Sequence, residues 1–233
     1  MVTGPTGSGK TTTLHALLRT RAGLGDNIMT LEDPVEYRFE FAAQTQVSDQ
    51  KGLYFEGGIA SVLRQDVDVL LIGEIRTASV AQMALRSAMT GHQIFTSVHA
   101  PNALAALDRL RDLGVSFEDM LSYIHCVISE RLVRRLCVAC KKKKHAQRAY
   151  EAVVCPECLG TGYRVRQILA ECLVMDERTV SAVRVRSAAN CALSYSTFKQ
   201  GAAHLIQAGI TSQEEIIRVL GEDMCLAGLS KVA

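Results

Sequence analysis

The sequence has neither a long apolar run nor a strong excess of charge of either sign. No stretch of about 18 apolar residues occurs, so we expect no membrane-spanning segment. The N-terminus lacks the basic and then apolar order of a secretory signal peptide. With 26 Lys and Arg against 24 Asp and Glu, the net charge of +2 gives no general case for nucleic-acid binding. Internal repeats and long disordered tracts are also missing, so the 233 residues suit one large domain or two small ones.

Strand-like and helix-like segments alternate in the first half of the chain. Short apolar runs predict strands at 27–31, 69–73 and 94–98, and helical patterns lie at 11–22, 55–65, 78–89 and 102–113. Such alternation is typical of a parallel sheet that helices cover on both faces. Segment 127–136 fits a strand or a helix equally well. Beyond it we expect a strand at 163–175 and helices at 196–208 and 212–219, the last capped by Thr211 or Ser212.

A phosphate-binding pattern stands at the start of the chain, where residues 4–11 read GPTGSGKT. Glycines let backbone N–H groups converge on phosphate oxygens, and the following helix presents its positive end to the same anion. The lysine of this pattern reaches the β- and γ-phosphates, and the Thr11 hydroxyl binds Mg²⁺. A chance glycine-rich turn is the alternative. The predicted ATP-binding residues are Gly4, Gly7, Ser8, Gly9, Lys10, Thr11 and Thr12.

Carboxylates follow two of the predicted strands. Glu74 lies in "LLIGEIR", and Glu32 and Asp33 lie in "TLEDPVEY". Ligands of open α/β sheets collect at the carboxyl ends of the strands. An acid there can hold the water shell of Mg²⁺ or polarise an attacking water. We therefore predict that Glu32 and Glu74 are catalytic; the alternatives are a solvated acid after a core strand and a turn led by Asp33-Pro34.

Two histidines flank the predicted strand at 94–98. His92 precedes it and His99 follows it, in "TGHQIFTSVHA". A lone histidine is more often structural than catalytic. Because His99 lies at the carboxyl end of the strand, it is the better candidate for sensing a γ-phosphate.

The cysteines are unevenly spread, and four of them form two CxxC pairs separated by fourteen residues. Two such pairs can complete a closed tetrahedral S₄ site for structural Zn²⁺, whereas packed thiols or a redox pair are the alternatives. The predicted zinc ligands are Cys137, Cys140, Cys155 and Cys158. The other four, Cys126, Cys172, Cys191 and Cys225, are expected to be small core residues. The run "KKKK" at 141–144 lies between the pairs, as a solvated loop or a contact for an anionic surface.

The motifs occur in the order seen in the secretion ATPase superfamily. The P-loop, "TLEDPVEYR", "LLIGEIR", "TGHQIFTSVHA", "ISERLVRRLC" and the paired CxxC resemble the elements of type II secretion and type IV pilus assembly ATPases. The resemblance covers nearly the whole chain and implies a RecA-like P-loop NTPase core with a mostly parallel sheet. It also implies a small zinc-binding module and a helical C-terminal region.

The resemblance also implies a biological role. Members are cytoplasmic hexamers at the inner face of the bacterial inner membrane, where they convert ATP hydrolysis into motion of a platform protein. Association with the membrane is peripheral, and no nucleic acid takes part. The functional roles of the family carry to Lys10, Thr11, Glu32, Glu74 and His99. Because assembly motors commonly carry the tetracysteine module and retraction motors generally lack it, assembly or secretion is favoured over retraction.

The chain departs from the family pattern at a few positions. Thr77 replaces the usual Asp after "GEIR", and Glu130 stands where Gln is common. The segment "FTSVHAPNA" also differs from the usual histidine box. These changes are compatible with neutral drift or with early decay of the motor.

Family members carry an N-terminal half before the P-loop. We therefore expect this chain to be the C-terminal ATPase part of such a motor, and the isolated chain to hydrolyse ATP poorly or not at all. The expected domains are a P-loop core at 1–136, a zinc module at 137–162 and a C-terminal region at 163–233.

Two other functions remain open from the sequence. The chain can be a nucleotide- and zinc-binding remnant without turnover, which the nearly absent first strand favours. It can also be a P-loop protein acting on nucleic acid, which the lack of a concentrated basic face with interleaved aromatics disfavours.

Overall fold

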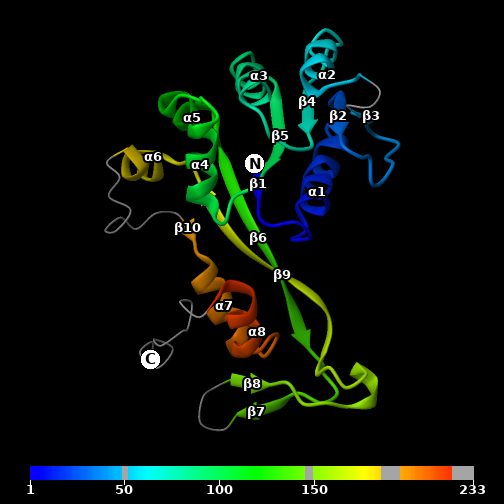
Figure 1. Ribbon diagram of the computed structural model, residues 1–233, viewed down its shortest axis with the longest axis vertical. Helices are drawn as coiled ribbons and strands as arrows, with labels where there is room; N and C mark the ends of the chain where they lie inside the picture. Colours follow the sequence, from blue (N-terminus) through cyan, green and yellow to red (C-terminus); the bar gives the residue numbers. More distant parts are fainter. Residues whose placement is uncertain (49–51, 145–148, 185–194, 222–233) are drawn as a thin grey trace. The chain divides into compact units, whose positions relative to one another are not determined.

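The computed structural model describes residues 1–48, 52–144, 149–184 and 195–221. The chain forms two compact units, unit 1 (Met1–Ser129 and Cys172–Ser194) and unit 2 (Glu130–Glu171 and Tyr195–Ala233). Figure 1 shows their elements in the colours of the sequence. The sequence predicts a different division, into domains at residues 1–136, 137–162 and 163–233. That division remains a prediction.

Unit 1 is built on a parallel sheet, as predicted. The strand order is β6-β1-β5-β4-β2-β3, and all of these neighbours pair in parallel. The strands are β1 (Val2–Thr3), β2 (Ile28–Glu32), β3 (Ala43–Gln46), β4 (Val69–Ile72), β5 (Gln93–Val98) and the start of β6 (Cys126–Leu136). Every residue of β4 is buried, which is the expected state of a central strand in a covered parallel sheet.

Three helices of unit 1 begin at residues whose side chains cap them. Thr77, Asn102 and Ser116 accept a hydrogen bond from the backbone N–H three residues later, at the starts of α3, α4 and α5. The helices are α1 (Lys10–Ala22), α2 (Phe55–Val62), α3 (Ala78–Met89), α4 (Ala103–Asp112), α5 (Phe117–Tyr123) and α6 (Glu177–Arg184). An apolar cluster packs α1 on the sheet: Val2, Leu14, Leu18, Ile28, Val69 and Leu71.

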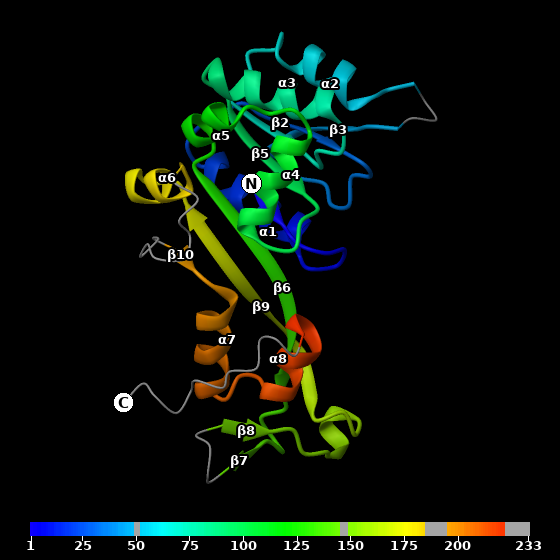
Figure 2. The same cartoon turned by 60° about the vertical axis from the view of Figure 1, so that its left-hand side comes forward.

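Unit 2 contains most of the long strands β6 and β9 (Tyr163–Val174), which are neighbours in the sheet, and the short β10 (Tyr195–Ser196). Figure 2 shows α7 (Phe198–Gln207) and α8 (Gln213–Leu220) beside the parts of β6 and β9 that belong to this unit. Val133 and Leu169 from the strands share an apolar cluster with Phe198 and Ile216 from the helices. The antiparallel pair β7 (Lys142–Lys144) and β8 (Ala149–Glu151) and the 3₁₀ turn η2 (Pro156–Cys158) complete the unit.

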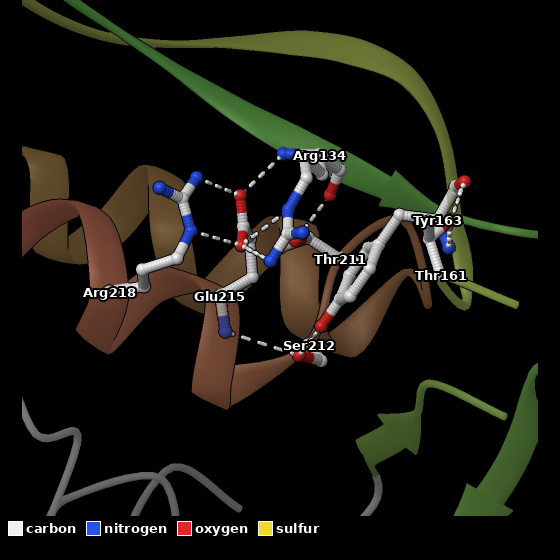
Figure 3. Close-up of polar contacts among 7 residues, drawn as sticks. All are labelled: Arg134, Thr161, Tyr163, Thr211, Ser212, Glu215 and Arg218. Carbon is white, nitrogen blue, oxygen red and sulfur yellow. Dashed lines mark hydrogen bonds and ion pairs between the residues drawn. The ribbon is translucent and has the colours of Figure 1, made fainter. Parts of the chain in front are cut away.

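A buried carboxylate joins α8 to β6 in unit 2. Figure 3 shows Glu215 between Arg134 and Arg218. Its Oε1 accepts from Arg134 N (2.8 Å) and Arg218 Nη2 (2.6 Å). Its Oε2 accepts from Arg134 Nε and Nη2 (2.9 and 2.7 Å) and from Arg218 Nε (2.7 Å). The side chain of Tyr163 continues this network, because its ring stacks on Arg134 and its hydroxyl lies 2.8 Å from Ser212 Oγ.

The structure resolves the ambiguous segment and adds elements that the sequence did not predict. Residues 126–136 form strand β6, and Ser212 is the N-cap of α8. The helices α5 and α6 and the edge strand β3 were not predicted. Within the described residues, no helix combines the length and the apolar character needed to cross a membrane.

Candidate functional site

The phosphate-binding loop connects β1 to α1. Gly9 is the N-cap of α1 with φ 107°, a left-handed conformation that side chains other than glycine rarely adopt. Gly7 has φ 75°, and no atom lies within 4 Å of the position a Cβ would take there, so its backbone angle rather than crowding requires glycine. Residues 5–7 are exposed, and Ser8 is buried and donates its N–H to Pro5 O (3.2 Å). The loop therefore presents an open turn at the N-terminus of a helix.

Lys10 and the two threonines after it begin α1, as predicted. Lys10 Nζ donates to Gly4 O (3.0 Å) and Pro5 O (3.1 Å), so the ammonium group lies over the loop. Thr11 is half-buried and Thr12 is exposed. An ammonium group and hydroxyl groups at a helix N-terminus suit the β- and γ-phosphates of a nucleotide and its Mg²⁺.

Thr3 links the phosphate loop to the end of β5. Its Oγ1 donates to Ala100 O (3.1 Å) and accepts from Ala100 N (3.0 Å), and the residue is fully buried. The next residue along the loop is Gly4, and the residue before Ala100 is His99. The two hydrogen bonds between Thr3 and Ala100 therefore fix the position of His99, the predicted sensor, relative to the P-loop. Sequence reasoning missed this contact because Thr3 and Ala100 are far apart in the chain.

The structure brings Glu74 and His99 together at the carboxyl ends of β4 and β5. Glu74 Oε1 lies 3.1 Å from His99 Nε2, and Glu74 Oε2 lies 2.9 Å from Arg76 Nη2. Arg76 also reaches Asp33 Oδ2 at 3.9 Å. The Glu74 side chain is 18% exposed, whereas that of His99 is 49% exposed, so the carboxylate is partly sheltered and remains accessible. An acid and a histidine in contact at this edge can act together on a metal-bound water or a phosphate.

Close packing of the strand ends holds Glu74 in place. A Cβ on Gly73 would lie 3.2 Å from Leu31 O and 3.4 Å from the Cα of Glu32. Gly73 N donates to Leu31 O (2.8 Å), and Gly73 O accepts from Ser97 Oγ (2.7 Å). A side chain in place of the glycine of "LLIGEIR" would push these backbones apart by a few tenths of an ångström, so glycine favours their close approach.

Glu32 lies in a different, buried group. Its Oε2 is 2.9 Å from His15 Nε2, and its Oε1 accepts from Thr30 Oγ1 (2.6 Å) and Gln44 Nε2 (3.0 Å). Only 3% of Glu32 is exposed. Burial raises the pKa of this carboxyl, but the hydrogen bonds from His15, Thr30 and Gln44 outweigh burial and lower it. Sequence reasoning missed His15 and Gln44 as partners of Glu32.

Two other positions singled out in the sequence have local structural contacts. His92 Nδ1 lies 3.0 Å from both Thr90 Oγ1 and Ser87 O, in the turn between α3 and β5. Thr77, which replaces the usual Asp, accepts from Val80 N (3.3 Å) as the N-cap of α3. A threonine can thus perform the capping role of an aspartate. Glu130 is fully buried in β6.

The four predicted zinc ligands converge in unit 2. The sulfur atoms of Cys137, Cys140, Cys155 and Cys158 all lie within 4.8 Å of one another. The pairs Cys137–Cys155, Cys140–Cys158 and Cys155–Cys158 are 3.9, 3.8 and 3.6 Å apart. Zn–S bonds of about 2.3 Å in a tetrahedron separate sulfur atoms by about 3.8 Å. The cysteine cluster therefore fits a zinc ion with four sulfur ligands.

The local backbone also suits bound thiolates. Burial raises the pKa of the Cys158 thiol, but N–H groups of Cys155 (3.4 Å) and Gly162 (3.2 Å) outweigh it and bring the pKa to about 6. Burial and the neighbouring sulfur atoms raise the pKa of Cys140. A bound cation would stabilise the thiolate form of all four ligands.

The other cysteines and the lysine run lie outside this cluster. Cys126 Sγ and Cys172 Sγ, both half-buried, are 3.6 Å apart, whereas Cys191 and Cys225 lie outside the described residues. Lys141 Nζ donates to Gly209 O (2.8 Å) at the end of α7, and Lys142 and Lys143 are exposed in β7.

Comparisons with known proteins match nearly the whole chain. The family model described as "Type II/IV secretion system protein" matches residues 1–218. The type II secretion system protein E of Klebsiella pneumoniae is 39% identical over 237 residues, which cover 94% of this chain and 48% of that protein. The type II secretion system ATPase E of Vibrio cholerae is 35% identical over 242 residues, covering 95% and 48%. The chain thus spans about half the length of the curated relatives it matches.

Solved structures share the fold. The ATPase DotB of Legionella pneumophila is similar with a TM-score of 0.69 and 24% identity, covering 92% of this chain and 57% of that one. The pilus retraction motor PilT with bound ADP gives a TM-score of 0.66 and 24% identity, covering 93% and 59%. These similarities confirm the predicted RecA-like α/β fold.

Proposed function

Because this chain belongs to the type II/IV secretion system protein family, we propose that it is the ATPase part of a hexameric motor for type II secretion or pilus assembly. The observation that carries the proposal is the convergence of a complete P-loop with the Glu74–His99 pair. Both stand at the carboxyl ends of neighbouring strands, β1, β4 and β5. Ligands of open α/β sheets bind at that edge.

Each residue of the site has a distinct task in this proposal. The backbone of residues 4–9 and Lys10 bind the β- and γ-phosphates of ATP, and Thr11 holds Mg²⁺, which supplies charge neutralisation when bound. Glu74 orients the water that would lie in the shell of the metal, and His99, whose Nε2 lies 3.1 Å from Glu74 Oε1, senses the γ-phosphate. Glu32 acts on the attacking water. The tetracysteine cluster holds structural zinc.

The proposal extends to the setting of the motor. The chain works as a homo-hexamer at the cytoplasmic face of the inner membrane, in peripheral contact with a platform protein that it moves, without nucleic acid. Type II secretion system protein E relatives support this assignment to a secretion machine.

A second candidate is a nucleotide- and zinc-binding subunit without turnover. The burial of Glu32 and its engagement by three side chains favour this alternative, since a catalytic acid must reach its water.

Two measurements test these functions. We expect a fluorescent ATP analogue to bind the chain in the presence of Mg²⁺, and phosphate release from ATP by this isolated part of the motor to be slow but detectable. Lys10→Ala should weaken binding at least tenfold, since it removes the charge that lies over the loop. Lys199→Ala, at an exposed position of α7, is the matched control and should change neither quantity.

The outcomes separate the two candidates. Glu74→Gln should leave binding within about threefold and lower phosphate release by a factor of 10² or more, because a carboxylate on the reacting water contributes about 10²–10⁴-fold. Binding without any phosphate release would favour the second candidate. Binding that Lys10→Ala leaves intact would exclude both.

A further inference from the structure

His15 connects the P-loop helix to Glu32. It lies four residues after Thr11 on α1, so the two side chains occupy one face of the helix, one turn apart. Its Nε2 is 2.9 Å from Glu32 Oε2, and His15 and Glu32 are 6% and 3% exposed. Figure 1 shows α1 beside the β2 and β3 edge of the unit 1 sheet, from which the other partners of Glu32 come. A buried contact thus joins the nucleotide-binding helix to the acid at the end of β2.

The direction of the hydrogen bond follows from the charge of Glu32. A carboxyl whose pKa is lowered is ionised near neutral pH and can only accept, so Nε2 of His15 donates. A carboxylate has about four acceptor positions. Thr30 and Gln44 use both positions of Oε1, and His15 uses one on Oε2. Among the described residues, Oε2 therefore keeps one acceptor position.

Aromatic side chains hold the imidazole ring of His15. Phe39 meets it edge-on at 4.7 Å between ring centroids, and Tyr37 meets it at 6.4 Å. Gln44 ties this loop to the same group, because its Oε1 accepts from Phe39 N (2.8 Å) and its Nε2 donates to Tyr37 O (2.8 Å). The ring is therefore confined to one orientation, and so is the bond that it makes to Glu32.

We propose that His15 is a positioning residue, which aims Glu32 so that the remaining acceptor position of Oε2 receives the water that attacks ATP. This inference rests on the proposed ATP hydrolysis. The positioning by His15 is also compatible with the burial of Glu32. The carboxylate can stay in its buried position, because only one acceptor position of Oε2 has to bind the water. The competing interpretation is that the buried His15–Glu32 contact only stabilises the packing of α1 on β2. Substitution of His15 would then lower the stability of unit 1 without a specific loss of ATP hydrolysis.

Variants of His15 with similar volume separate these interpretations. His15→Gln can donate from its amide Nε2, whereas His15→Met fills the space without a donor. We expect His15→Met to lower the turnover number about 10²-fold, the usual cost of a misplaced catalytic group. Affinity for ADP with Mg²⁺ should stay within threefold, and His15→Gln should recover most of the loss. His204→Ala, an exposed histidine of α7, is the control and should have no effect.

A second readout does not depend on turnover. ADP with aluminium fluoride and Mg²⁺ mimics the transition state, so a correctly aimed Glu32 should make it bind more tightly than ADP alone. His15→Met should reduce this gain in affinity by about the same factor as turnover, and Glu32→Gln should abolish it. In the Glu32→Gln background, His15→Met should cause no further loss, because His15 acts only through Glu32.

The outcomes distinguish failure of the positioning role from failure of the proposed function. Equal behaviour of the Met and Gln variants, or a His15→Met effect of the same size with and without Glu32, overturns the positioning role while the proposed function stands. A wild-type chain that neither hydrolyses ATP nor gains affinity from aluminium fluoride overturns the proposed function, and this inference falls with it.

Discussion

Glu32 in unit 1 and Glu215 in unit 2 are buried to the same degree, 3% and 1% exposed, but their partners differ. Glu215 accepts from two arginines, with three donors on Oε2 and two on Oε1 (Figure 3). Glu32 accepts from one histidine, one hydroxyl and one amide. The first carboxylate is saturated and can only hold elements together. The second keeps an acceptor position, so counting occupied lone pairs separates structural from reactive acids where burial does not.

The difference extends to the two units. Unit 1 places its polar groups around an open phosphate loop on an apolar, parallel sheet. Unit 2 depends on charged centres, the Arg134–Glu215–Arg218 cluster and the tetracysteine cluster. Perturbing the charged centres should therefore unfold parts of unit 2 and leave nucleotide binding in unit 1 intact.

Removal of zinc is the largest expected perturbation. The segment between Cys137 and Cys158 exposes Val138 and Val154 (80% and 66%), so apolar burial contributes little to its stability. Structural zinc contributes apparent free energies of about 10–16 kcal/mol in zinc-finger peptides. Elemental analysis should find one zinc per chain. A chelator or Cys155→Ser should raise amide hydrogen exchange around the cysteines and at the end of α7, where Lys141 binds Gly209 O.

Nucleotide affinity is the internal reference for that experiment. It should stay within threefold after zinc removal, and Cys172→Ser, outside the cluster, should retain the metal. Protein purified without metal that still protects these amides from exchange would show that the cysteines are packed thiols.

Perturbing the Arg134–Glu215–Arg218 cluster should have the second largest effect. Arg134→Ala leaves the buried carboxylate of Glu215 with Arg218 as its remaining arginine, and a buried acceptor that loses hydrogen-bond donors costs about 1–3 kcal/mol. Hydrogen exchange of α8 measures the effect, because a single unfolding transition is not expected for two compact units. Arg135→Ala, the exposed neighbour in β6, is the matched control. Equal protection of α8 in both variants would contradict the assigned role of the cluster.

The pH dependence of unit 2 should follow Glu215. Burial raises its pKa, but hydrogen bonds from Arg218 and Arg134 outweigh burial and lower it from 4.5 to about 2. A depressed pKa means that the stabilisation is complete above about pH 4.5 and is lost as the pH falls towards 2. In Arg134→Ala the loss should still begin near pH 4.5, but it should be complete at a higher pH, because one of the two arginines that lower the pKa is gone.

Local sequence patterns predicted much of the fold and part of the candidate site. The P-loop, the acid after β4 and the CxxC spacing depend on neighbours in the sequence, and the structure places Glu74 beside His99 and gathers the four cysteines. Contacts between distant segments could not be predicted. His15 and Gln44 meet Glu32 only because α1 and β3 pack beside β2, and no local pattern marks them. Segment 127–136 was ambiguous because its pairing with β1, not its own sequence, makes it a strand.

The smallest expected effect concerns Thr77, where the family usually has Asp. Thr77 caps α3 through Val80 N (3.3 Å), and loss of an N-cap costs about 1 kcal/mol. Thr77→Ala should therefore lower the free energy of unfolding of unit 1 by that amount, measured by hydrogen exchange of α3, whereas Thr77→Ser should stay close to wild type. Thr77→Asp restores the cap, but it also places a second carboxylate near Glu56, which now accepts from Thr77 Oγ1 (3.2 Å).

The repulsion from Glu56 and the better cap should nearly cancel in Thr77→Asp. Both groups are exposed, so their repulsion is worth only a few tenths of a kcal/mol and weakens in salt. Adding Glu56→Gln to Thr77→Asp removes the repulsion and should make α3 more protected than in Thr77→Asp alone. If that double variant gains nothing, threonine at this position is not an adaptation to Glu56. In that case the exchange of Asp for Thr costs the chain only the difference between two capping residues.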